Sequence, residues 1–202
     1  MNDSVRRTPL GLTVLALLHY QPLHPYGVQR LVKLWGKDQV VNIGQRTSVH
    51  RCIDRLAAQG LIQVRETGRD QAYPERTVYQ ITDAGRATAR EWLDQTLAEP
   101  KPEFPEFPAA LSHLLMITPA EALDALRRRV EAVEGDLAKI EAGLAASAER
   151  GLPRVTAIED EYLRAVKTAE RDWLRSVIGE LESGAFRWSP EDVADLADEL
   201  TS

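Results

Sequence analysis

The sequence contains a single cysteine, Cys52, so no disulfide can form within the chain. Such cysteine usage is typical of a reducing compartment, and we expect a cytoplasmic location. There is no run of eighteen apolar residues, which argues against a transmembrane helix. The apolar stretch 10–18 follows basic residues, but no small-residue cleavage site comes after it. We therefore expect neither a targeting signal nor a membrane partner.

The sequence also lacks the usual signatures of catalysis. It has no glycine-rich phosphate loop and no nucleophile with a base at a suitable spacing. The four histidines share no helix face and have no cysteine or carboxylate partner at ligand spacing. They are His19, His24, His50 and His113. We expect no catalytic residues, no metal and no cofactor, and an enzyme with a dispersed site remains only as an alternative.

Charge is distributed unevenly along the chain. The net charge of −6 at pH 7 argues at first sight against nucleic acid. Residues 1–90, however, contain 13 Lys and Arg against 7 Asp and Glu, a net charge of +6. Residues 91–202 contain 12 against 24, a net charge of −12. This pattern indicates that only the front half faces a polyanion, with chance asymmetry between solvated surfaces as the alternative.

Helix and strand signals in the first half follow the order of a winged helix-turn-helix. Thr8-Pro9 starts a helix with a hydroxyl cap and a proline at the first helical position, and Pro25 starts a second helix. Gly60 ends a third helix. A polar, turn-rich tip between two strand patterns predicts a hairpin. The expected elements are helices at 8–20, 25–36, 46–59 and 83–98 and strands at 61–66 and 77–81.

The second half predicts long helices. Residues 99–108 contain four prolines and cannot form a continuous helix, so we interpret them as a linker. A short apolar helix is expected at 109–117, and Thr118-Pro119-Ala120-Glu121 combines a capping box with an N-terminal proline. Apolar residues then alternate in steps of three and four, which predicts a coiled-coil-like seam. The seam residues are Leu123, Leu126, Val130, Val133, Leu137, Ile140 and Leu144.

A second long helix is expected at about 155–182, after the break at Gly151-Leu152-Pro153. One side of it is apolar: Tyr162, Val166, Ala169, Trp173 and Val177. Ser189-Pro190 would cap a short, acidic terminal helix. The seam suits an intrachain hairpin or a dimer, and we expect both.

The predicted fold class is therefore mostly α (α+β), with an N-terminal winged helix-turn-helix and a C-terminal region of long antiparallel helices. The domains are a winged helix-turn-helix at 1–98, a Pro-rich linker at 99–108 and a helical dimerisation or effector region at 109–202.

The third helix carries the residues expected to bind DNA. Its apolar face would pack on the first two helices: Val49, Cys52, Ile53 and Leu56. Hydroxyl, imidazole and guanidinium groups on the opposite face suit base edges in the major groove, and arginines of the hairpin suit phosphates. Asp54 would orient Arg51 or Arg55, or accept from a cytosine amine. The candidate DNA-binding residues are Thr47, Ser48, His50, Arg51, Arg55, Arg69 and Arg76.

Several stretches together resemble the PadR family of transcriptional regulators. These are Leu12-Thr13-Val14-Leu15-Ala16-Leu17-Leu18, Leu23-His24-Pro25-Tyr26-Gly27, Ile53-Asp54-Arg55-Leu56 leading to Gly60-Leu61-Ile62, and Val78-Tyr79-Gln80-Ile81-Thr82-Asp83-Ala84-Gly85-Arg86. The resemblance covers about residues 8–98 and extends more loosely into 121–146, where the family has a variable dimerisation region. The chain departs from the family at His50, where tyrosine is frequent, and at Pro25, where glycine is frequent.

The resemblance implies a homodimer that binds a roughly palindromic operator in double-stranded DNA and usually represses. It also implies release of DNA by a small, often aromatic or lipophilic, effector. Trp92 and Trp173 are candidate walls of an effector pocket, with plain packing as the alternative. Cys52 is expected in the core, with a redox-sensing thiol as the alternative.

Two other classes of binding protein compete with this interpretation. A MarR-like regulator usually has its winged helix mid-chain with dimerising helices at both ends, whereas here the first core helix begins near Thr8. An interaction adaptor would use the winged helix to bind protein and not DNA, and the acidic overall charge keeps that alternative open.

Overall fold

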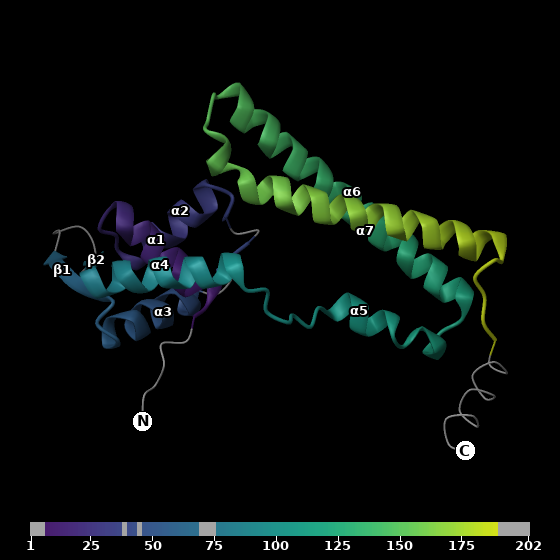
Figure 1. The fold of residues 1–202 in the computed structure, drawn as a ribbon, viewed down its shortest axis with the longest axis horizontal. Helices are drawn as coiled ribbons and strands as arrows, with labels where there is room; N and C mark the ends of the chain where they lie inside the picture. The colour runs from purple at the N-terminus through teal and green to yellow at the C-terminus, as the bar shows by residue number, and fades with distance from the viewer. Residues whose placement is uncertain (1–6, 38–39, 44–45, 69–75, 190–202) are drawn as a thin grey trace, which may run out of the picture. The chain divides into compact units, whose positions relative to one another are not determined.

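The computed structural model describes residues 7–37, 40–43, 46–68 and 76–189, with the side chains of residues 46, 47, 67, 68 and 76 left undescribed. It divides into two compact units, residues 1–102 and 103–202, which we describe separately. Within the described ranges, no helix is both long enough and apolar enough to cross a bilayer. Figure 1 shows the elements of both units in chain order.

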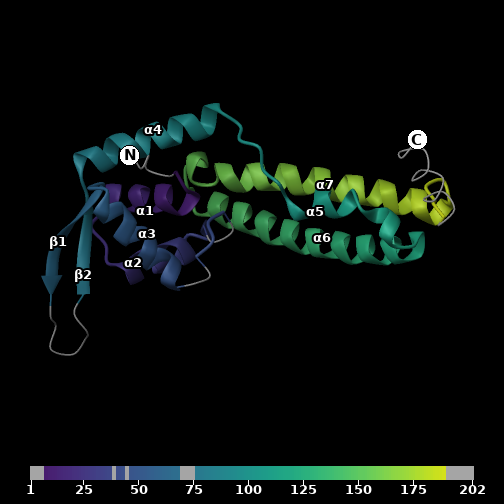
Figure 2. The ribbon, with the colours of Figure 1, turned by 90° about the horizontal axis from the view of Figure 1, so that it is seen from below.

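The first unit has the element order of a winged helix-turn-helix. The β1–β2 hairpin is antiparallel, and in Figure 2 it extends away from the helices of this unit. The elements are α1 (Pro9–Tyr20), α2 (Pro25–Leu34), α3 (Arg46–Ala58), β1 (Ile62–Gly68), β2 (Arg76–Ile81) and α4 (Asp83–Ala98). Each predicted helix and strand of this half is present, with ends that differ from the prediction by two residues at most.

A side chain caps the N-terminus of each of the first two helices, directly before the proline that begins the helix. Thr8 Oγ1 accepts a hydrogen bond from Gly11 N at 3.0 Å at the start of α1. His24 Nδ1 accepts from Gly27 N at 2.9 Å at the start of α2, a cap that the sequence analysis did not assign. A proline follows each cap at the first helical position, where its missing N–H costs no hydrogen bond.

One hydrophobic core holds the first unit together. The predicted apolar face of α3 is part of this core, because Val49, Cys52, Ile53 and Leu56 are all at most 3% exposed. Buried side chains of α1, α2, both strands and α4 complete it, namely Val14, Leu15, Leu17, Leu18, Val28, Val32, Ile62, Ile81 and Trp92. Burial of one face of α3 fixes which side chains the other face presents to solvent.

The turn after α3 is closed by backbone hydrogen bonds around a left-handed glycine. Gly60 has φ +69°, its N–H donates to Ala57 O, and Leu61 N donates to Leu56 O, the pair of bonds that defines a Schellman motif. Thr82 then joins the end of the hairpin to this turn, because its hydroxyl donates to Gly60 O at 2.8 Å while capping α4. The wing and α3 are therefore held in one geometry.

Gly85 is required for the docking of α4 on this turn. A Cβ atom at this position would lie 2.0 Å from the backbone oxygen of Leu61. We expect Gly85→Ala to lower the free energy of unfolding by roughly 3 kcal/mol, the upper end of the overpacking range, because the clashing atom is backbone. The measurement is urea unfolding followed by far-UV circular dichroism.

Gly135→Ala is the matched control, since nothing lies within 4 Å of its Cβ position on a helix. There we expect a gain of up to about 1 kcal/mol from helix propensity. A Gly85→Ala protein as stable as Gly135→Ala would contradict the close packing of α4.

The hairpin has two local features that place its side chains. The strand register shifts between Val64 and Glu66, so Arg65 is the extra residue of a bulge. At its base, Leu23 and Tyr79 exchange two backbone hydrogen bonds, Leu23 N to Tyr79 O at 3.0 Å and Tyr79 N to Leu23 O at 2.9 Å. This bridge, which no sequence pattern predicted, ties β2 to the turn before α2.

The second unit begins with a helix that starts earlier than expected. It contains α5 (Glu106–Leu111), the short 3-10 helices η2 (Leu114–Met116) and η3 (Arg154–Thr156), and the long helices α6 (Pro119–Glu149) and α7 (Ile158–Ser183). The predicted linker 99–108 thus ends inside α5. Pro108 is tolerated there because it is the third residue of the helix, where an N–H has no intrahelical partner.

Helices α6 and α7 pack side by side as an antiparallel hairpin. The predicted capping box is present, since Thr118 Oγ1 accepts from Glu121 N and the Glu121 carboxylate accepts from Thr118 N. That bond lowers the pKa of Glu121 below its ordinary value. The apolar core of the pair is formed by Leu126, Val130, Val133 and Leu137 of α6 with Leu174, Val177, Ile178 and Leu181 of α7.

The predicted apolar side of α7 is mostly not the side that packs on α6. Tyr162, Val166 and Trp173 are 69%, 45% and 44% exposed, whereas Leu174 is fully buried. The predicted period is correct, but the predicted stripe lies next to the one that faces α6. The stripe belongs to the second unit. The terminal helix predicted after Ser189 lies outside the described residues.

Candidate nucleic-acid interface

Helix α3 presents a polar face opposite its buried one. His50 and Arg51 are exposed, and Ser48 is half-buried beside them. Neither His50 nor Arg51 forms a hydrogen bond or ion pair with another described residue, so both side chains keep their hydrogen-bonding capacity for a ligand. Thr47 lies in the first turn of α3, but its side chain is among those left undescribed.

Arg55 differs from the other candidate residues because it has partners within the first unit. Its Nη2 lies 3.4 Å from Thr8 Oγ1 and 3.9 Å from Cys52 Sγ. It therefore joins α3 to the cap of α1, and it is less available to DNA than its exposure indicates. No described contact joins Asp54 to Arg51 or Arg55, so the structure gives no support to an orienting role. The alternative, in which Asp54 accepts from a cytosine amine, stays a prediction.

Cys52 is a core residue of α3. Its side chain is 3% exposed. Burial raises the pKa of the Cys52 thiol above its ordinary value, and the nearby Arg55 guanidinium offsets this only in part. A thiol that stays protonated and covered is a poor nucleophile, which disfavours the redox-sensing alternative.

The hairpin candidates are placed only in part. Arg69 lies outside the described residues, and Arg76 is the first residue of β2 with its side chain undescribed. Arg65 is exposed in the bulge of β1. The hairpin therefore contributes at least one exposed guanidinium to the first unit.

The start of α2 contributes polar groups that the sequence analysis did not select. Tyr26 and Arg30 are exposed, and they line a hollow of about 270 Å³. The other lining residues are Gln21, Leu23, His24, Gly27 and Leu31. In helix-turn-helix proteins the helix before the recognition helix crosses the DNA backbone. Arg30, a basic residue on the predicted second helix, could therefore have been selected from the sequence as a candidate phosphate contact.

The two tryptophans proposed as pocket walls have packing contacts. Trp92 is 6% exposed in the core of the first unit, where a Cβ at Gly11 would lie 3.3 Å from its ring. Trp173 packs edge-to-face on Phe107, with 6.1 Å between ring centroids. No group of three or more potential metal ligands gathers anywhere in the described ranges of the chain.

Comparison with known proteins finds a family that most of the first unit resembles. Residues 14–91 match the transcriptional regulator PadR-like family. No curated protein matches the chain significantly.

Solved structures extend the likeness over most of the chain. Bacillus subtilis PadR in complex with operator DNA gives a TM-score of 0.71 at 17% identity, covering 86% of this chain and 99% of that chain. The same protein in complex with p-coumaric acid gives 0.68 at 15% identity, covering 86% and 98%. The Vibrio cholerae virulence activator AphA gives 0.64 at 23% identity, again covering 86% and 98%.

A winged helix that matches this family description, followed by long C-terminal helices, is the architecture of a DNA-binding transcriptional regulator. Over residues 14–91, the winged helix of this chain is similar to that of the PadR-like regulators. The resemblance inferred from the sequence and the predicted fold class are thereby confirmed.

Proposed function

We propose that the chain is a homodimeric repressor that binds a roughly palindromic operator and is released from it by a small molecule. The observation that carries DNA recognition is the geometry of α3. Four fully packed residues fix its inner face, and His50 and Arg51 stand on the outer face without a partner among the described residues. Arg51 would donate to the guanine O6 and N7 atoms of the major groove, the commonest base-specific contact of arginine.

The contacts around α3 would supply affinity and not sequence information. Arg65, Arg69 and Arg76 of the hairpin and Arg30 of α2 are the proposed phosphate contacts, together with Thr47 and Ser48 at the start of α3. His50 would contact a base edge or a phosphate. Arg55 is proposed to contact the DNA backbone only when its hydrogen bond to Thr8 is broken.

The homodimer is supported by the exposed apolar stripe of α7. Tyr162, Val166, Ala169 and Trp173 form a continuous row of apolar side chains in steps of three and four on one side of the helix. An exposed row of this kind is unfavourable in water and is typical of an interface. A two-fold dimer would present two α3 helices about 34 Å apart, which is one turn of DNA.

Release by an effector and a cytoplasmic location complete the proposal. The effector is supported by a protein of the same fold, Bacillus subtilis PadR, whose structure has been solved in complex with p-coumaric acid. Repression is supported by what the family resemblance implies.

The test is an electrophoretic mobility shift with the DNA upstream of the chain's own coding sequence, at two salt concentrations. A dimer that neutralises about six to ten phosphates should lose about 10³–10⁵-fold in affinity between 50 and 200 mM salt. An adaptor that binds only protein would show no shift at either concentration, and that result would reject the proposal.

A further inference from the structure

A groove in the second unit has the size and lining of a small-molecule site. It lies between the α5–η2 segment and the first half of α6, and its volume is about 470 Å³. Sites for small molecules are usually about 300–1,000 Å³ and mostly apolar. The groove is lined by Phe107, Ala110, Leu111, His113, Leu114, Met116, Ile117, Ala122, Ala125, Leu126 and Arg129.

The groove has a firm floor and exposed rims. Ala122 and Leu126 of α6 are buried beneath it, while Met116 on η2 is 83% exposed. Trp188 fixes one rim, because its Nε1–H donates to Ile117 O at 2.8 Å. Water in such a groove would find few hydrogen-bonding partners, which favours an occupant with an apolar body.

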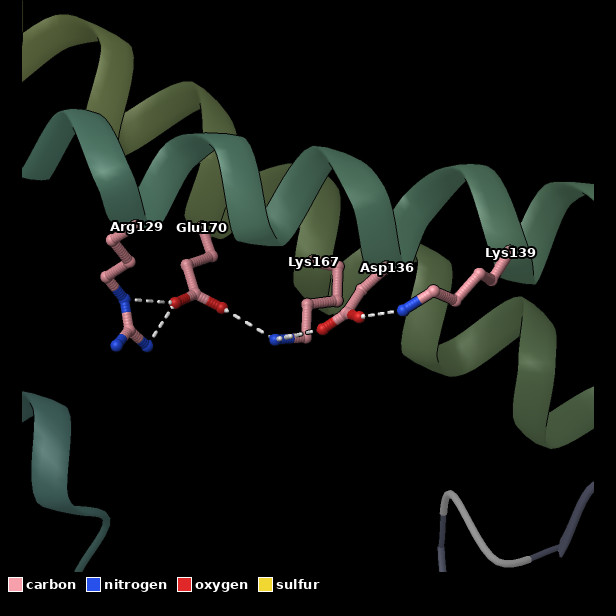
Figure 3. A network of polar contacts seen from close by, with 5 residues as sticks. All are labelled: Arg129, Asp136, Lys139, Lys167 and Glu170. Carbon is pink, nitrogen blue, oxygen red and sulfur yellow. Dashed lines mark hydrogen bonds and ion pairs between the residues drawn. The ribbon is translucent and has the colours of Figure 1, made fainter.

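Arg129 is the one cation among the lining residues. Its guanidinium carbon lies 3.4 Å from the centroid of the Phe107 ring, which fixes the plane of the group. Its Nε and Nη2 both donate to Glu170 Oε1. Nη1 forms no hydrogen bond with a described residue, and Figure 3 draws one terminal nitrogen of Arg129 without a contact. The planar group can therefore hold Glu170 on one edge and a second carboxylate on another.

The charges around Arg129 favour an anion. Arg129, Lys167 and Lys139 form a chain of ion pairs with Glu170 and Asp136, shown in Figure 3. Glu170 shares its single charge between Arg129 and Lys167. A carboxylate on the ligand would give Arg129 a second anionic partner.

We propose that this groove binds an amphiphilic monocarboxylate, with its carboxylate on Arg129 and its apolar body over Leu114, Ile117 and Leu126. The groove belongs to the second unit, whereas the proposed DNA-binding residues belong to the first. It deepens the effector part of the proposed function, and it rests on that function only for the effect of the ligand on DNA.

The test is calorimetric titration of the full-length chain, without DNA, with octanoate, 1-octanol and octyltrimethylammonium. We expect one saturable octanoate site per chain, with at least about tenfold weaker binding of the alcohol and no binding of the cation. Arg129→Lys keeps the charge and a partner for Glu170 but loses the planar fork, and should weaken octanoate binding at least about tenfold. Ala110→Leu should fill the groove and weaken it similarly.

Ala132→Leu is the matched control, because Ala132 is exposed on α6 and does not line the groove. It should bind octanoate as the unmodified chain does. The proposal is overturned if octanoate does not bind, if the cation binds equally well, or if Ala110→Leu has no effect. It is also overturned if Ala110→Leu instead converts dimers to monomers, because the groove is then filled by a second copy.

Failure of this site and failure of DNA recognition can be told apart. A chain that shifts DNA but does not bind octanoate would lack only the site. A chain that binds octanoate but shifts no DNA would retain the site and lack the proposed function.

Discussion

Replacing Arg51 by alanine should reduce operator affinity by about 30-fold to about 2 × 10⁴-fold. A bidentate arginine–guanine contact is worth about 1–3 kcal/mol, and a two-fold dimer makes it twice, which gives about 2–6 kcal/mol. The fold should be unchanged, since Arg51 is exposed and has no described partner. Mobility shifts with operator and with unrelated DNA, at one salt concentration, measure the effect.

The comparison with unrelated DNA separates base recognition from simple charge loss. Arg128→Ala removes the same charge from an exposed position of α6 in the second unit, and should leave operator affinity within about threefold. If Arg51→Ala weakens operator and unrelated DNA equally, Arg51 contacts phosphate, and the role assigned to it is wrong.

A charge in the exposed stripe of α7 should separate the dimer. Val166 is 45% exposed in the isolated chain and would be covered by the partner. An aspartate there would place an unpaired carboxylate in the interface, at a cost of several kcal/mol per copy. We expect Val166→Asp to behave as a monomer in sedimentation or light scattering, and its operator affinity to fall at least about 100-fold because the two half-sites are no longer linked.

Arg164→Ala is the matched control for this substitution. It also makes the chain more negative by one charge, but Arg164 lies on the far side of α7 from the stripe. It should remain dimeric and bind the operator normally. A Val166→Asp chain that stays dimeric would show that another surface joins the two copies, and the stripe would lose its assigned role.

Local sequence signals were sufficient for the elements of the winged helix. Helix α4 has the predicted bounds, and the C-terminal end of α3 follows from a local signal, Gly60. The inner face of α3 was predictable because apolar residues in steps of three and four form a single stripe along a helix, and that stripe packs on the core. The outer face followed from the inner one.

Contacts between distant residues could not be predicted in this way. Arg55 and Thr8 are 47 positions apart, and only the docking of α3 on α1 brings them together. The bridge of Leu23 with Tyr79 likewise depends on tertiary packing. Periodicity therefore overestimated how available Arg55 is.

The second unit shows a different limit of sequence patterns. Helix α7 has two neighbouring apolar stripes, one with Leu174 and one with Trp173, and periodicity alone does not decide which of them faces α6. The groove beside Arg129 was also missed, because its walls come from α5, η2 and α6. Its residues are ordinary apolar ones that no motif distinguishes.

The most direct test of the account is guanine methylation interference on the bound operator. Methylation at N7 lies in the major groove, where α3 is proposed to bind. We expect interference in two patches about 10 base pairs apart on one face of the duplex, and its loss at specific guanines in Arg51→Ala. No interference at any guanine of the bound operator, or a pattern that Arg51→Ala leaves unchanged, would contradict recognition of DNA by α3.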